Sequence, residues 1–201
     1  NIPGRIPYQG SLVLRGEAVI PYSEFEKINA QIEDADAKYK NPRNLCSGSV
    51  RQLNNEITAK RSVYFYAFSY VKAELDGAEP PFENDRENQF RFLKEQGFDV
   101  VPYKRVNADT IMAEIEWYAQ AIQTYDIPSD GLVLCYCDLA YSASLGLTAK
   151  FPRDSIAFKW ADETAETTLL EIEWSPSRTG LINPVAIFEP VELEGTTVSR
   201  A

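Results

Sequence analysis

The sequence contains no histidine among its 201 residues. The absence of imidazole excludes serine–histidine and cysteine–histidine nucleophile pairs, histidine-ligated zinc and imidazole acid–base catalysis. Any chemistry must therefore use lysine, arginine, aspartate, glutamate, tyrosine or a hard metal ion.

Cysteine and long hydrophobic runs are also scarce. Three cysteines, an odd number, favour reduced thiols in a cytosol over a disulfide framework. Cys135 and Cys137 have no third or fourth ligand beside them, so we interpret them as core residues and not as a metal site. No apolar run approaches the roughly 20 residues that span a bilayer, and no secretion signal opens the chain. We therefore predict a cytoplasmic protein without a membrane partner.

The chain has the composition of a globular protein but an uneven charge. Hydrophobic residues at 44% and charged residues at 25% exclude disorder and fibrous repeats. The 20 basic residues against 30 acidic ones give a net charge of −10. Residues 41–61 are nevertheless basic, with Arg43, Arg51, Lys60 and Arg61 against Glu56 alone. This segment could bind phosphate, and a solvated loop that carries arginines is at least as consistent with the charge alone.

Hydrophobic periodicity predicts a mixture of helices and strands up to about residue 160. A capping box at Ser23 and Glu26 predicts a helix that ends before Pro42. A polar loop is expected at 41–49, with short helical turns after it. Further helices are predicted at 87–96 and around 111–122, and strands at 11–20, 62–71 (buried), 98–103, 131–137 and 155–160.

The predicted secondary structure changes from mixed helices and strands to strands alone after Asp162-Glu163. Three strands without a helix between them are predicted at 167–174, 181–188 and 191–198. We place a domain boundary near residues 161–164, which gives domains of 1–163 and 164–201. The second is too short for an independent core and is predicted to be the opening of a small β-barrel.

Three charged residues lie within or next to apolar strands. Glu17 lies in a strand that is otherwise apolar. It could be a charge on an edge strand, a partner of Arg15 or a residue that contacts a ligand. The ligand role is favoured because buried charges are rarely without a partner. Asp130 precedes an apolar strand, where a plain turn aspartate is the simpler explanation. Lys159, between Phe158 and Trp160, must reach a polar cavity or solvent.

Several motifs follow one another in a particular order along the whole chain. They are Arg15-Gly16-Glu17, Asn41-Pro42-Arg43-Asn44, Gly48-Ser49-Val50-Arg51-Gln52-Leu53, Ile57-Thr58-Ala59-Lys60-Arg61, Asp130-Gly131-Leu132-Val133, and the block at 151–160. This order resembles the adenylation domain of NAD-dependent DNA ligases. Arg178-Thr179-Gly180, Asn183-Pro184-Val185-Ala186 and Glu189-Pro190-Val191 are similar to the entry of that family's OB-fold.

The resemblance implies a fold and a chemistry. The fold would be an α+β nucleotidyltransferase fold with antiparallel sheets and flanking helices, followed by the first strands of an OB-fold. In that family a lysine attacks the α-phosphate of NAD, AMP stays on the lysine and then passes to the 5′-phosphate of a nick, and the 3′-hydroxyl displaces it. Such enzymes act on nicked duplex DNA in replication and repair. This chemistry uses cations and Mg²⁺ on phosphate and needs no imidazole, in agreement with the missing histidines.

The resemblance also implies roles for particular residues. Glu17 would contact the adenylate ribose, and Lys159 would meet the AMP phosphate, so these two are the expected catalytic residues. Phe68 would pack on the adenine, although it could equally be a core residue of its aromatic strand. The expected cofactor-binding residues are Glu17, Phe68, Lys159, Arg43 and Asp130, and the expected DNA-binding residues are Arg51, Arg61 and Arg178. No metal ligand is assigned.

Three departures from the family's pattern affect these expectations. The nucleophile motif K-x-D-G is absent, so we expect an inactive fragment whose parent protein carries that lysine upstream. Cys135 stands where many relatives carry a phosphate-contacting lysine, so either a subfamily does without that charge or activity is compromised. The remainder of the OB-fold, a cysteine zinc finger (where zinc would be expected) and the small domain that grips the nicotinamide mononucleotide half are also missing.

Two other classes of function stay open from the residues alone. One is a non-catalytic nucleotide- or nucleic-acid-binding module on the same scaffold, and the other is a structural protein without a ligand. A K-x-D-G motif upstream in the parent gene would favour the ligase, which we expect to be a monomer.

Overall fold

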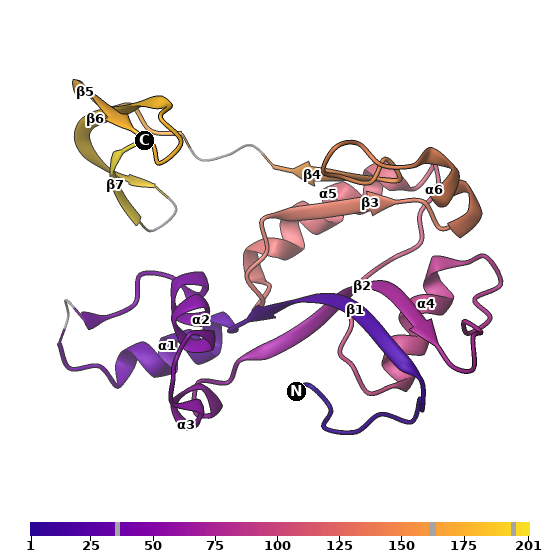
Figure 1. Ribbon diagram of the computed structural model, residues 1–201. Helices are drawn as coiled ribbons and strands as arrows, with labels where there is room; N and C mark the ends of the chain where they lie inside the picture. The colour runs from indigo at the N-terminus through magenta and orange to yellow at the C-terminus, as the bar shows by residue number, and fades with distance from the viewer. Residues whose placement is uncertain (35–36, 161–163, 194–195) are drawn as a thin grey trace. The chain divides into compact units, whose positions relative to one another are not determined.

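The computed structural model describes residues 1–34, 37–160, 164–193 and 196–201, and it divides the chain into two compact units. One unit comprises Asn1–Lys38 with Pro42–Trp160, and the other comprises Tyr39–Asn41 with Ala161–Ala201. Both sheets of the first unit and the sheet of the second are antiparallel, and helices flank the first two (Figure 1). The predicted α+β class is confirmed.

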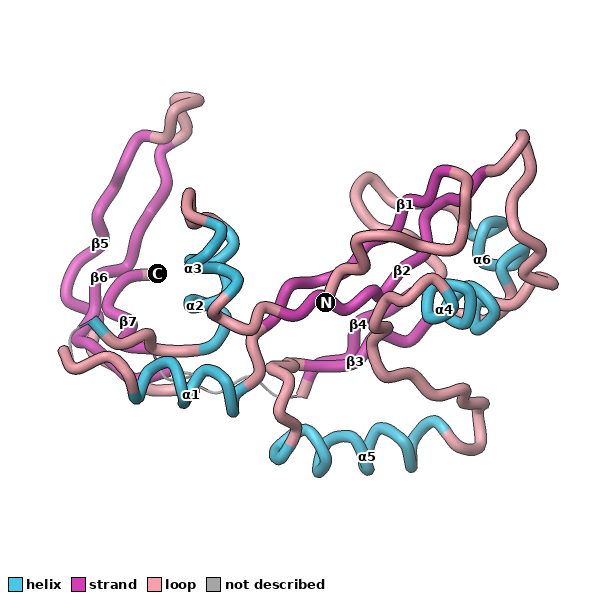
Figure 2. Tube along the Cα trace, turned by 90° about the horizontal axis from the view of Figure 1, so that it is seen from below, coloured by secondary structure: helices cyan, strands magenta, loops and turns pink. Residues whose placement is uncertain are grey.

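The first unit contains most of the helices. Its elements in chain order are β1 (Ser11–Val19), α1 (Tyr22–Ala30), α2 (Pro42–Val50), α3 (Asn55–Ala59), β2 (Tyr64–Glu74), α4 (Arg86–Glu95), α5 (Ile111–Ala121), the 3₁₀ turn η2 (Ile122–Thr124), β3 (Gly131–Cys135), α6 (Leu139–Leu145) and β4 (Ser155–Lys159). Figure 2 shows α2 and α3 toward one end of the β1–β2 pair and α4 toward the other. No helix in the described part of the chain is long and apolar enough to cross a membrane.

Strands β1 and β2 approach each other unusually closely at Gly16. A Cβ atom there would lie 2.2 Å from the Phe65 ring and 2.5 Å from the Tyr66 carbonyl oxygen, so only glycine fits. The pairing also shifts beside it, from Arg15↔Ser69 to Gly16↔Ala67, which leaves Phe68 as an extra residue on β2. This is a β-bulge, a feature that re-aims a side chain and is frequent next to functional sites.

The core of the first unit forms where α4 packs against β2. Ala67 and Leu93 are fully buried and contact Val100 there. Asp85 caps α4 by accepting a hydrogen bond from the Glu87 amide, and Gly97, with φ +87°, follows the helix end. The helix predicted at 87–96 is therefore confirmed, and so is the one around 111–122.

The strands predicted at 98–103 and 62–71 differ from the structure. Residues 98–103 form no strand, because Val100 makes only an isolated parallel bridge to Ala67. Strand β2 is not buried throughout: Ala67 and Ala73 are its buried residues, and the other side chains are half-buried or exposed. Its one strand neighbour among the described residues is β1.

Three local predictions between β1 and β2 were wrong. Ser23 does not cap α1; it lies inside the helix, and its amide and hydroxyl donate to the two carboxylate oxygens of Asp126 at 2.8 and 2.7 Å. The helix ends at Ala30 instead of reaching Tyr39, and the predicted helical position Ala35 lies outside the described residues. The expected loop at 41–49 is helix α2, which starts on a proline, as helices tolerate in their first turn.

Strands β3 and β4 pair in a simple register. Gly131 lies opposite Lys159, and Cys135 lies opposite Ser155. Opposed residues of an antiparallel pair point to the same face, and alternate residues share it. Cys135 and Lys159 therefore project from one face of this pair, whereas Phe158 belongs to the other. The strand predicted to run to 137 ends at Cys135, and α6, which was not predicted, follows.

The second unit is a three-stranded sheet in the order β5–β6–β7. Its strands are β5 (Leu169–Pro176), β6 (Ile182–Leu193) and β7 (Thr196–Arg200). Three strands without a helix were predicted, but the expected break at Glu189-Pro190 is wrong, since β6 continues through it with a register irregularity between Ile187 and Val191. The predicted domain boundary near 161–164 falls mainly on residues 161–163, which lie outside the described residues.

Candidate functional site

Lys159 and Asp130 form an ion pair at the end of the β3–β4 pair. Lys159 Nζ donates to Asp130 Oδ2 at 2.9 Å. Gly131 makes this possible because a Cβ atom there would lie 2.4 Å from the Phe158 carbonyl oxygen. The Lys159 hydrogen bond lowers the pKa of the Asp130 carboxyl, partial burial opposes it, and the charge of Arg43 adds to the lowering. Two candidate cations thus act on one carboxylate.

Glu17 and Phe68 lie on the solvent-facing side of the β1–β2 pair. Glu17 is exposed and lies opposite Tyr66. Phe68 follows the buried Ala67, so it turns away from the core, and 45% of its surface is exposed. The alternative of Phe68 as a core residue is therefore wrong. An exposed aromatic ring and an exposed carboxylate on the same strand pair suit a flat, hydroxylated ligand.

Helix α2 connects the strand that carries Glu17 with the cation Arg43. Its Cys46 is buried and donates from Sγ to the Ala18 carbonyl oxygen at 3.1 Å. Burial raises the pKa of the Cys46 thiol, and the nearby charge of Glu17 raises it further. Arg43 stands one turn before Cys46 on the same helix. Helix α2 therefore contacts the strand that carries Glu17 through Cys46, and its Arg43 acts on the carboxylate of the Lys159–Asp130 pair.

The three candidate DNA-binding arginines differ in their surroundings. Arg61 is half-buried and donates from Nη1 to Ser49 Oγ at 3.0 Å. Arg51 is exposed directly after the end of α2. Arg178 is exposed in the turn between β5 and β6, in the second unit.

Cys135 and Cys137 are not core residues, contrary to the prediction. Cys135 is exposed and Cys137 is half-buried. Although Cys135 is accessible to solvent, the protein around its thiol raises the pKa by burial, and the charge of Arg86 opposes this only in part. The thiol is therefore neutral near pH 7 and supplies no positive charge on the face that it shares with Lys159. No three Cys, Asp or Glu side chains in the described residues gather into a group that could hold a metal ion.

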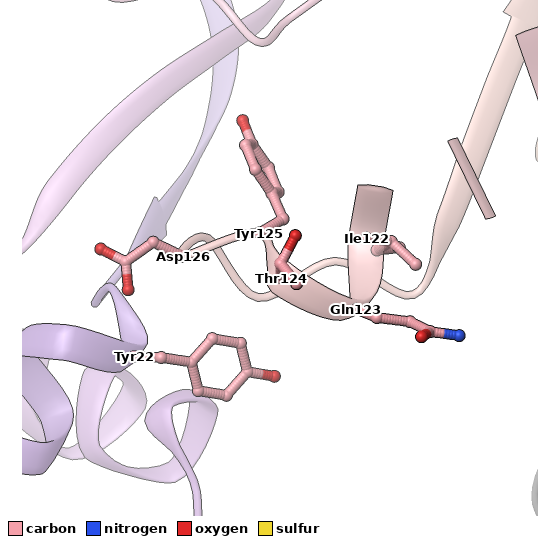
Figure 3. A pocket seen from close by; sticks show the side chains of 6 residues that line it. All are labelled: Tyr22, Ile122, Gln123, Thr124, Tyr125 and Asp126. Atoms are coloured by element: carbon pink, nitrogen blue, oxygen red, sulfur yellow. The ribbon is translucent and has the colours of Figure 1, made fainter. Parts of the chain in front are cut away.

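Two shallow pockets lie away from these residues. One, of about 460 Å³, is lined by Tyr22 at the start of α1 and by residues 122–126. Figure 3 shows the ring of Tyr22 below the turn and the side chain of Tyr125 directed away from it. The other, of about 440 Å³, includes the Arg86–Asp154 ion pair. Neither lining includes Glu17, Asp130 or Lys159, and these three side chains are exposed.

The arrangement suits binding of a nucleotide phosphate. Lys159 and Arg43 supply positive charge, Glu17 can accept hydrogen bonds from hydroxyl groups, and Phe68 offers a face for a base. Fixed cations stabilise negative charge that develops on a phosphoryl group, and this requires no imidazole.

Comparison with known proteins supports the same conclusion. A family model described as the NAD-dependent DNA ligase adenylation domain matches residues 1–163, and one described as the NAD-dependent DNA ligase OB-fold domain matches residues 166–201. The chain belongs to the NAD-dependent DNA ligase family.

Individual relatives agree with this membership. The chain is 64% identical to a DNA ligase of Ruminiclostridium cellulolyticum over 201 residues and 65% identical to one of Lachnoclostridium phytofermentans over 202 residues. A DNA ligase of Bacillus licheniformis is 40% identical over 206 residues. Each alignment covers 100% of this chain and 30% of the relative. The chain thus spans about 30% of the length of these relatives.

Sequence reasoning missed the contacts of two residues of this chain. Ser49 is buried and contacts Arg61, and its signal was its place in the Gly48-Ser49-Val50-Arg51 motif. Arg86 binds the Asp154 carboxylate at 2.5 Å and the Tyr136 carbonyl oxygen at 2.9 Å. No spacing in the sequence indicated Arg86, because its partners lie 50 and 68 residues away.

Proposed function

We propose that this chain is part of an NAD-dependent DNA ligase that seals nicks in duplex DNA. The parent enzyme would transfer AMP from NAD to a lysine, then to the 5′-phosphate at a nick, before the 3′-hydroxyl displaces it. Family membership over both domains supports this proposal, and the observation that carries it within the structure is the Lys159–Asp130 pair with Arg43 beside it.

In this proposal each residue of the site has a distinct task. Lys159 and Arg43 bind phosphate oxygens, Glu17 contacts the ribose, and Phe68 packs on the adenine. The Lys159 ammonium has three donors, so it can keep its bond to Asp130 while it binds phosphate. Asp130 then orients the lysine for the nucleotide. Arg51, Arg61 and Arg178 would contact the phosphate backbone of the DNA.

The remaining assignments follow from the same proposal. NAD supplies the adenylate, and the aromatic, carboxylate and cationic side chains of the site fit such a ligand. We propose that Mg²⁺ enters with the phosphates, because Mg²⁺ is commonly held by one or two carboxylates together with substrate phosphates. We further propose domains of 1–163 and 164–201, a monomeric enzyme and a cytoplasmic location.

Adenylation of the parent protein tests this function. Incubated with NAD and Mg²⁺, the parent should gain one AMP in intact-mass measurements, and Lys159→Ala should slow this on the order of a hundredfold, because a fixed cation on the reacting phosphate is lost. Lys150→Ala is a matched control, since Lys150 is an exposed lysine of a neighbouring loop. The 201-residue chain alone, which has no K-x-D-G motif, should form no adduct. Normal adenylation by the Lys159 variant would contradict the proposal.

One observation favours a second candidate, a nucleotide- or nucleic-acid-binding module without catalysis. The thiol of Cys135 is neutral on the face where the resemblance places a lysine. If the parent binds AMP but neither forms an adduct nor seals a nick, this second function replaces the first.

A further inference from the structure

Ser49 lies at the centre of the α2–α3 segment. Its side chain is fully buried, and its hydroxyl donates to the Leu45 carbonyl oxygen at 2.6 Å. Its own carbonyl oxygen accepts from Thr58 Oγ1 at 2.7 Å, which ties α3 to α2. The same hydroxyl accepts the bond from Arg61 Nη1 at 3.0 Å. One buried residue therefore holds the helix, the following turn and an arginine together.

The chemistry of the partners determines which group donates in the two hydrogen bonds of the Ser49 hydroxyl. A serine hydroxyl has one proton and two lone pairs, and the proton of Ser49 is directed to Leu45. The oxygen is left as an acceptor aimed at Arg61. The backbone of Arg61 is held as well, because its amide donates to the Thr58 carbonyl oxygen at 3.0 Å. Both ends of this long side chain are thus fixed, which restricts its rotamers.

The contact between Ser49 and Arg61 differs from the contact that holds another arginine, Arg86. Arg86 pairs with the carboxylate of Asp154 at 2.5 Å, so its charge is neutralised within the fold. Ser49 is neutral, and its hydroxyl orients the planar guanidinium of Arg61 through a hydrogen bond to an uncharged group. An oriented guanidinium suits phosphate, which it can bind through two parallel N–H donors.

We propose that Ser49 is a positioning residue that orients Arg61 toward a phosphate of the DNA backbone. This proposal rests on the proposed function, in which Arg61 contacts nicked duplex. Ser49 itself is buried and touches no DNA; it acts through the Arg61 side chain.

A double-mutant cycle on the parent protein tests the proposal. Affinity for nicked duplex is measured over a range of salt concentrations for Arg61→Ala, Ser49→Ala and the double variant. Arg61→Ala should weaken binding and reduce the salt slope by about one, because one phosphate contact is lost. Ser49→Ala should weaken binding roughly 3- to 10-fold, the effect of one hydrogen bond, and should add no further loss when Arg61 is already alanine.

Two controls separate positioning from general damage. Ser47→Ala removes an exposed hydroxyl from the same helix and should change nothing. Thr58→Ala removes the side-chain bond to the Ser49 carbonyl oxygen and keeps the backbone bond between the Thr58 carbonyl oxygen and the Arg61 amide, so it should leave the salt slope unchanged.

The outcomes identify which idea fails. If Arg61→Ala leaves affinity and salt slope intact, the DNA contact of Arg61 is wrong, and the positioning role falls with it. If Arg61→Ala weakens binding and Ser49→Ala does not, only the positioning role is overturned. A Ser49→Ala loss that persists in the Arg61→Ala background also overturns it, because the serine would then act through the fold alone.

Discussion

The candidate cations stand on two regions that are built differently. In α2, which carries Arg43, and at its contact with Arg61, the supporting residues are buried: Leu45 and Ser49 are both 0% exposed. In the β3–β4 pair, which carries Lys159, the supporting side chains are open, with Val133 70% and Ile156 67% exposed. In the first region the packing of buried side chains positions Arg43 and Arg61. In the second, strand register and the ion pair with Asp130 position Lys159. Truncation of a supporting side chain should therefore cost more stability in the first region than in the second.

Leu45→Ala should cause the largest loss of stability. Truncation of a fully buried leucine leaves a cavity and typically costs about 3 kcal/mol. Ile156→Ala on the exposed pair should change the free energy of unfolding by less than about 0.5 kcal/mol. Urea unfolding of the chain followed by tryptophan fluorescence measures both. Equal losses in the two variants would remove the contrast between the regions.

Cys135→Lys should be tolerated. The position is exposed and shares a face with Lys159, so the new ammonium meets solvent. A change below about 1 kcal/mol moves the melting midpoint of a chain of this size by no more than about 4 °C. Leu134→Lys is the control, because Leu134 is half-buried on the opposite face and should lower the midpoint further. A large drop for Cys135→Lys would mean that the faces of β3 are assigned the wrong way round.

The Lys159–Asp130 pair should contribute the smallest effect, and one that depends on pH. The pKa of Asp130 lies below its ordinary 3.8, so the contribution is complete above that value and is lost as the pH falls through the lowered pKa. Both side chains are exposed, 58% for Lys159 and 76% for Asp130, which limits the pair to a few tenths of a kcal/mol.

Asp130→Asn tests this dependence. The variant should be slightly less stable than the wild type in urea at pH 7 and equal to it near pH 2, and added salt should shrink the difference at pH 7. A difference that is the same at both pH values would show that Asp130 contributes through something other than its charge.

Periodic and locally capped elements could be predicted from the sequence. Helix α4 has its cap at Asp85 and its end at Gly97, so all its signals lie within a short stretch. The strand that carries Glu17 was also found, because a run of branched apolar residues needs no distant partner to be recognised.

The predictions that were wrong have one physical cause: contacts between residues far apart in the sequence decided the local structure. The residues of α2 include glycine, serines and a proline, which favour a loop locally, yet burial of Leu45 and Cys46 stabilises a helix. The start of α1 is held by Asp126 and not by its own capping box. The pairing of Asp130 with Lys159 depends on strand register and could not be seen in the spacing of the residues. The site was therefore predicted residue by residue from the resemblance, and its internal contacts were not.

The contact between Ser23 and Asp126 also has a consequence for synthesis on the ribosome. The two residues are 103 positions apart, and the amide of Tyr22 likewise donates to the Asp126 carbonyl oxygen. At translation rates of roughly 5 to 20 residues per second, Asp126 is made about 5 to 20 seconds after Ser23. During that interval the first turn of α1 has no partner for these donors. The beginning of the helix, although it is synthesised early, is therefore completed only after a further 103 residues of the chain have been made.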